Sequence, residues 1–251
     1  MPLTDPARSL RRPLTTKLAP VTGLLASFLL IEWASSYRLL ASLLALHLAV
    51  SPTLVRLLEH AVWQFGVGML AITLLSRGHL WSYGINSSDI RLSMAILLKF
   101  YGVAVGIVIL GVVLPLTFSQ EIPEYLRGLS RIDMAGWIIF EWMAAAVADE
   151  IFFHGLLQTV LLKFWRKEFV IGQYKIPAVV IVAAIAFAAG RSNVAVYGNN
   201  VVDFILALGI GVYGGLVYHR TRSLLTPMLS QAFFYGLPFV IRFVFLSFRA
   251  G

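Results

Sequence analysis

Two adjacent carboxylates and an imidazole lie within a segment apolar enough to cross a bilayer, Ala144-Ala-Ala-Val-Ala-Asp-Glu-Ile-Phe-Phe-His-Gly-Leu-Leu-Gln158. Ionised groups in hydrocarbon are costly, so they face a protein interior or a wet cavity. On a helix, Glu150 and His154 share a face, whereas Asp149 points about 100° away from Glu150. A carboxylate in such a place can activate water as a general base.

Two further polar sets follow in the second half of the chain. Arg191 ends the stretch Phe187-Ala-Ala-Gly-Arg191, and an amide and a phenol lie in the last apolar segment. Donors of these kinds can stabilise a developing oxyanion. We predict that six side chains converge in one intramembrane cavity: Asp149, Glu150, His154, Arg191, Gln231 and Tyr235. Glu141, eight residues before Asp149, is assigned to the wall of the same cavity.

The composition predicts a membrane protein. The chain has 251 residues, of which 59% are hydrophobic and 13% charged, whereas soluble domains are about 45–50% apolar and about 25% charged. We predict an all-α fold, a polytopic transmembrane helical bundle of about seven to eight helices at about 20 residues each. The absence of cysteine excludes disulfides, cysteine catalysis and thiolate metal sites.

The formal net charge is +8, and the basic residues cluster between apolar spans. This pattern indicates contact with anionic lipid, and no nucleic acid partner is expected. If the N-terminus is cytoplasmic, the inside loops carry most of the positive charge, as the positive-inside rule requires. These loops hold Arg77, Arg91, Lys163, Arg166, Lys167, Lys175, Arg220 and Arg222.

The chain divides into three parts. Residues 1–17 are interpreted as a basic cytoplasmic tail, and 18–133 as the N-terminal transmembrane helices, in which 18–50 is either one long tilted span or a span plus a surface helix. Residues 134–251 form the core that carries the polar side chains. Within this core, helices are expected at about 134–162, 176–189, 201–218 and 224–245.

Three stretches in the second half resemble the CAAX-protease and bacteriocin-immunity (Abi) family. The most specific is Gly215-Leu-Val-Tyr-His-Arg-Thr-Arg-Ser-Leu-Leu-Thr-Pro227, and Gly155-Leu156 follows the acidic pair as in the family. The resemblance covers about residues 134–240. It implies the family's membrane fold and an intramembrane endopeptidase activity, for which the best-known substrates are prenylated CAAX proteins.

The family's polar residues are replaced at nearly every position. Asp149 stands where the family has the glutamate that activates water, and Glu150 matches the second glutamate. His154 replaces an arginine, and Arg191 replaces the histidine that assists the first glutamate. The family's oxyanion-binding histidine and asparagine correspond to two other side chains here, Gln231 and Tyr235.

These replacements predict a divergent or catalytically impaired member. Aspartate withdraws the carboxylate by about 1.5 Å, whereas catalysis requires placement within about 0.5 Å. Arginine stays protonated and cannot act as a base. The expected function is therefore to bind a membrane-embedded or lipidated protein partner in the polar cavity, with no cofactor and no metal.

Three alternatives remain. The acids and His154 can form a buried ionic network that only fixes helix packing. The chain can be an active endopeptidase that uses Asp149 or Glu150 with His154, or a carrier of protons or small solutes. Arg191 within hydrogen-bonding distance of either acid would block the position of the attacking water.

Overall fold

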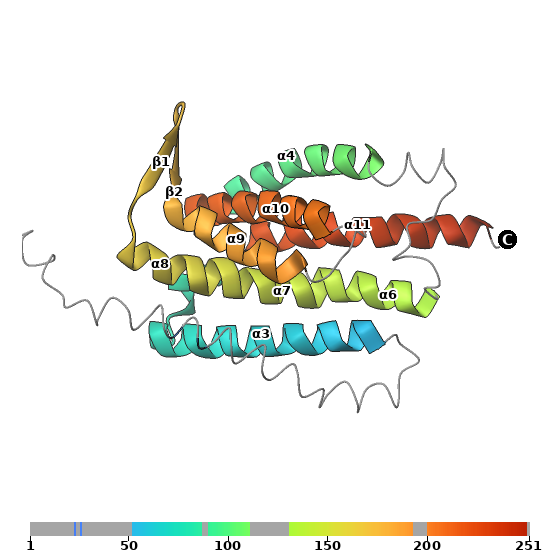
Figure 1. The fold of residues 1–251 in the computed structure, drawn as a ribbon, viewed down its shortest axis with the longest axis horizontal. Helices are drawn as coiled ribbons and strands as arrows, with labels where there is room; N and C mark the ends of the chain where they lie inside the picture. Colours follow the sequence, from blue (N-terminus) through green and yellow to red (C-terminus); the bar gives the residue numbers. More distant parts are fainter. Residues whose placement is uncertain are drawn as a thin grey trace, which may run out of the picture.

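A computed structural model describes residues 52–86, 90–110, 131–192 and 200–249, together with Gly23 and Ala26. Most of these residues are helical, and the helices run side by side in an elongated bundle (Figure 1). The predicted tail at 1–17 lies outside the described residues, and so does nearly all of 18–50.

Four helices in the described part of the chain are long and apolar enough to cross a membrane. They lie in α3 (Pro52–Ser76), α4 (Ile90–Val108), the continuous helix from Arg131 to Phe164, and α10 (Asn200–Thr221). Two further helices, α9 (Ala178–Ser192) and α11 (Leu225–Arg249), contain shorter apolar stretches. The chain is therefore a helical membrane protein, as predicted, and the expected number of seven to eight helices stays a prediction.

The helix from Arg131 to Phe164 is the centre of the bundle. It consists of α6 (Arg131–Ile139), η5 (Phe140–Ala145), α7 (Ala146–Asp149), η6 (Glu150–Gln158) and α8 (Thr159–Phe164). Within the protein, 78% of its apolar window is buried, against 17–44% for the other three candidate spans. Two of its parts, η5 and η6, are π-helical, a geometry frequent at functional sites. The prediction of a single helix over 134–162 is confirmed, but its uniform α-helical geometry is wrong.

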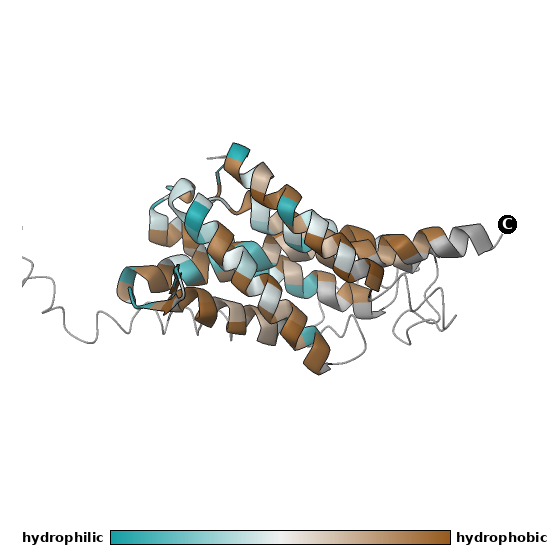
Figure 2. Ribbon diagram, turned by 90° about the horizontal axis from the view of Figure 1, so that it is seen from above, coloured by the Kyte–Doolittle hydropathy of each residue, from teal (hydrophilic) through white to brown (hydrophobic). Residues whose placement is uncertain are grey.

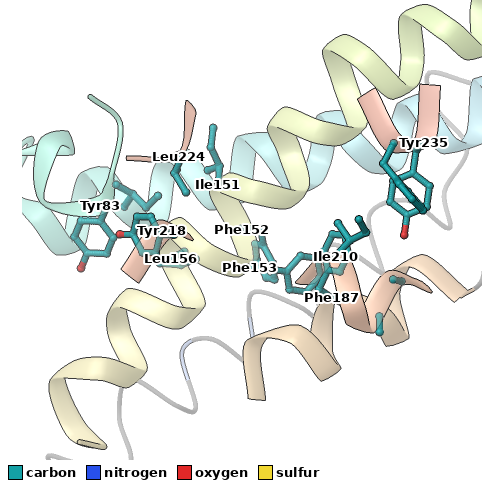
Figure 3. Close-up of a cluster of buried hydrophobic side chains, with 14 of the residues drawn as sticks. Tyr83, Ile151, Phe152, Phe153, Leu156, Phe187, Ile210, Tyr218, Leu224 and Tyr235 are labelled. Carbon is teal, nitrogen blue, oxygen red and sulfur yellow. The ribbon is translucent and has the colours of Figure 1, made fainter. Parts of the chain in front are cut away.

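Aromatic side chains fill the space between this helix and α9. Phe153 meets Phe152 and Phe187 edge to face, with ring centroids 5.3 and 5.6 Å apart (Figure 3). Such pairs stabilise a core beyond the area that they bury. Figure 2 shows hydrophilic positions within these otherwise hydrophobic helices. The polar side chains are therefore set into an apolar bundle.

Two connections are joined at one end of the bundle. The Leu224 N–H donates to the Gly84 carbonyl at 2.9 Å, and the Asn86 amide donates to the Arg222 carbonyl at 2.9 Å. At the same end, the Lys163 ammonium donates to the Tyr83 hydroxyl at 3.0 Å. The three connections that were expected to share one side of the membrane therefore do lie together.

A β-hairpin connects α8 to α9. Its strands, β1 (Glu168–Ile171) and β2 (Tyr174–Pro177), pair antiparallel with Phe169 opposite Ile176. The sequence analysis treated this segment as a basic connection and did not predict strands. The described part of the chain is therefore not purely α-helical.

A substitution at Gly215 tests the close packing of α10 against α9 and η6. A Cβ atom there would lie 2.9 Å from both Val180 Cγ1 and Gln158 Oε1. Gly215→Ala is expected to destabilise the protein by about 1–3 kcal/mol, measured as thermal unfolding in detergent. Gly209→Ala, on the same helix but with nothing within 4 Å of the added atom, is the matched control and should be neutral or stabilising. Equal stability of the two variants would contradict this packing.

Candidate functional site

The first polar pair lies on η6. The His154 Nδ1 atom is 2.7 Å from Glu150 Oε2, and both side chains are buried. The other ring nitrogen, Nε2, lies 3.0 Å from the Gly211 carbonyl oxygen on α10. Gly214 allows this approach, because its ideal Cβ would lie 3.2 Å from the imidazole and 3.4 Å from Glu150 Oε1.

These contacts fix the number of protons in the pair. A carbonyl oxygen only accepts, so His154 Nε2 carries a hydrogen and donates it to Gly211. A second proton must lie between Nδ1 and Glu150 Oε2, since two bare acceptors would repel at 2.7 Å. The pair is neutral overall whether this proton belongs to the imidazole or to the carboxyl group. His154 therefore has no free lone pair with which to accept a proton from water.

Gln158 extends the contact with α10 by one turn. Its amide Nε2 donates to the Gly215 carbonyl at 2.9 Å. This bond and the bond from His154 to Gly211 both join residues 57 positions apart in the sequence. Equal separations mean that η6 and this part of α10 run in the same direction, in a fixed register.

The second polar group is centred on Arg191, at the end of α9. Its Nη2 donates to Glu141 Oε2 at 2.7 Å, and its Nη1 lies 3.5 Å from Asp149 Oδ2. The guanidinium carbon lies 4.2 Å from the centre of the Tyr235 ring on α11, which is favourable for a cation. Two carboxylates from the central helix thus share one buried cation.

Asp149 has a second partner on α11. The Gln231 amide Nε2 donates to Asp149 Oδ2 at 2.6 Å. The same carboxylate oxygen therefore faces a neutral amide donor and a guanidinium. Asp149 and Glu150 belong to different networks, as their predicted angular separation requires.

The six predicted residues are all buried, and none is more than 6% exposed as a whole residue. The structure divides them into two groups: Glu150 with His154, and Asp149 with Arg191, Gln231 and Tyr235. Glu141, which the sequence assigned to the cavity wall, makes the shortest contact of Arg191. The contribution of Gln158 and the α10 carbonyls was not predicted, although Gln158 follows Glu150 by eight residues on the same helix.

No metal ligand cluster accompanies these groups. Among the described residues, no set of three or more histidine, cysteine or acidic side chains is placed to hold an ion. The described polar centre contains paired acids, an imidazole, a guanidinium, an amide and a phenol.

An apolar helical bundle with a buried ionic centre on its most enclosed helix defines an integral membrane protein with a polar intramembrane site. Residues 131–237 match the family described as Type II CAAX prenyl endopeptidase Rce1-like. The match covers the central helix, α9, α10 and the part of α11 that carries Gln231 and Tyr235. It confirms the resemblance to the CAAX-protease family over this segment. No curated protein and no solved structure matches the chain.

The Glu150–His154 pair predicts that the double leucine variant is more stable than the single His154→Leu variant. His154→Leu leaves a buried carboxyl group without its partner and should cost about 3–5 kcal/mol of stability. Glu150→Leu together with His154→Leu removes both polar groups and should restore most of that loss. Thermal unfolding in detergent measures both, and additive losses in the double variant would contradict the pairing.

The two ion pairs of Arg191 predict which second substitution restores more stability to an Arg191→Leu variant. Arg191→Leu leaves two carboxylates facing each other and should destabilise the protein by about 3–5 kcal/mol. Adding Glu141→Gln should recover more stability than adding Asp149→Asn, because Glu141 lies closer to the guanidinium and Asp149 keeps its bond from Gln231. The reverse order would show that Asp149 is the main partner of Arg191.

Proposed function

We propose that this protein is a non-hydrolytic membrane protein with an Rce1-like core, which binds a membrane-embedded or lipidated protein partner. The observation that carries the proposal is the environment of Asp149, which occupies the place of the family's water-activating glutamate. Its Oδ2 atom accepts from Gln231 at 2.6 Å and lies 3.5 Å from the Arg191 guanidinium. This carboxylate oxygen is engaged by an amide donor and faces a cation, so it is not free to accept a proton from water.

The state of His154 supports the same proposal. Both of its ring nitrogens are engaged, one by Glu150 and one by Gly211. A general base must reach the proton that it removes with a free lone pair. With Arg191 at the position of the assisting histidine, the described polar centre contains no free imidazole base beside Asp149.

A protein that keeps the fold of the family but does not hydrolyse peptides can still use that fold to recognise and bind a partner. The matched family is described as a CAAX prenyl endopeptidase, and the best-known substrates of the CAAX-protease family, prenylated proteins, present an apolar chain and a polypeptide tail together. A bundle set in the bilayer can receive both parts at the level of the lipid. The proposed partner is accordingly a lipid-modified or membrane-spanning segment.

We also propose that the N-terminus is cytoplasmic. The support is the gathering of three basic connections at the end of the bundle where α3 stops, around the contacts of Tyr83 with Lys163 and of Asn86 with Arg222; the one span expected before α3 then brings the N-terminus back to this side. Positive connections of this length are retained on the cytoplasmic side.

A crosslinking assay tests the function. The full chain in lipid nanodiscs is incubated with a photoreactive farnesylated CAAX peptide, and products are analysed by mass spectrometry. We expect crosslinked peptide of intact mass, which is lost in competition with unlabelled farnesylated peptide and absent when the peptide lacks the farnesyl group. Empty nanodiscs are the background control, and an active CAAX endopeptidase assayed in parallel validates the substrate.

One outcome would reject this function, and a second would leave only a membrane-spanning partner. Cleavage of the peptide that disappears in Asp149→Ala or Glu150→Ala would identify the chain as an active endopeptidase. Absence of competable crosslinking to the wild-type protein would remove lipidated peptides as the partner.

A further inference from the structure

The β-hairpin is the part of the structure that the polar centre does not account for. A turn of two residues joins its strands, and Gly172 in this turn has φ of 60°, as hairpin turns require. The Ala178 N–H donates to the Lys167 carbonyl at 2.8 Å and closes the base. Figure 1 shows the hairpin extending across the direction of the helices, at the end of the bundle where α8 stops.

The hairpin exposes apolar side chains. Val170 is 68% exposed, Phe169 45%, and Trp165, just before the hairpin, 42%. Phe169 pairs with Ile176 and Val170 with Lys175 across the strands, so apolar groups lie on both faces. Isolated two-stranded hairpins are marginally stable in water. We therefore expect another surface to cover the hairpin and to bury its exposed apolar side chains.

The charged side chains around the hairpin indicate which surface covers it. Arg166, Lys167 and Lys175 are exposed around these apolar side chains, and Glu168 is the single acid between Lys163 and Lys175. The Lys167 ammonium lies 5.9 Å from the centre of the Phe169 ring. Aromatic and basic residues mixed in this way suit the interface of a bilayer that contains anionic lipid.

The position of the hairpin also favours the lipid bilayer as its partner. It follows directly after α8, the end of a candidate span, and leads directly into the apolar helix α9. Because it runs across the helix direction, it lies along the membrane surface when the helices cross the bilayer (Figure 1). Its nearest extended surface is therefore the headgroup layer of the chain's own membrane.

We propose that this hairpin lies within the headgroup layer and binds anionic phospholipid there, with Phe169 on one face and Val170 on the other in contact with lipid, and with Lys167 and Lys175 on the lipid phosphates and carboxylates. The binding is independent of the function proposed for the polar centre. It anchors the end of the central helix to one leaflet and makes the protein sensitive to the charge of that leaflet.

The absence of native cysteine makes a direct test simple. Val170→Cys is labelled with an environment-sensitive fluorophore in the full chain, which is reconstituted into phosphatidylcholine nanodiscs with or without phosphatidylserine. We expect a blue-shifted emission with phosphatidylserine that high salt reverses. Lys167→Gln with Lys175→Gln should lower the equilibrium constant for headgroup binding by about fivefold for each lysine removed.

Leu98→Cys is the matched control, because Leu98 is 66% exposed on the candidate span of α4 and should report the same environment in both lipids. Phe169→Ser should weaken the hairpin signal in phosphatidylserine while the Leu98 signal stays unchanged. Equal emission from the Val170 label in the two lipid mixtures, or a shift that persists at high salt and in the double lysine variant, would overturn the proposal.

Discussion

A charged side chain within a bilayer must find its partner inside the protein, because the lipid tails offer none. The central helix places Glu141, Asp149, Glu150 and His154 under this constraint, and three neighbouring helices each supply a different partner group. A guanidinium comes from α9, backbone carbonyls from α10, and an amide from α11. The relative positions of these helices therefore depend on the polar pairs as well as on the aromatic core.

The same pairing that holds the helices together also engages several polar atoms of the motif residues. A general base needs a free lone pair and a charge that its surroundings do not fully stabilise. A buried ion, in contrast, needs partners for its charge and its lone pairs. Asp149 Oδ2 faces Arg191, and His154 is bonded through both nitrogens, as the second requirement predicts. Arg191 pairs with both Glu141 and Asp149, whereas its Nε atom and Glu141 Oε1 have no hydrogen-bond partner among the described residues.

The sequence predicts the helices well because long apolar runs in a membrane have few alternatives. The expected 176–189 and 201–218 correspond to α9 and α10, and the polar residues of the motifs lie in two separate buried networks. Three features escaped prediction for physical reasons. The carbonyls of Gly211 and Gly215 act through the backbone, the π-helical turns alter a period assumed to be 3.6, and the short strands around Gly172 resemble an ordinary basic connection.

The fixed register between η6 and α10 has a consequence for changes in chain length. Residues 154 and 158 meet carbonyls at 211 and 215, so a residue inserted between the two donors or between the two acceptors would misalign one bond of the pair. A residue added to the hairpin, between the two bonded segments, changes neither spacing. Insertions and deletions are therefore restricted in the two helices and tolerated in the hairpin, where the protein can vary its membrane-surface element without altering its interior.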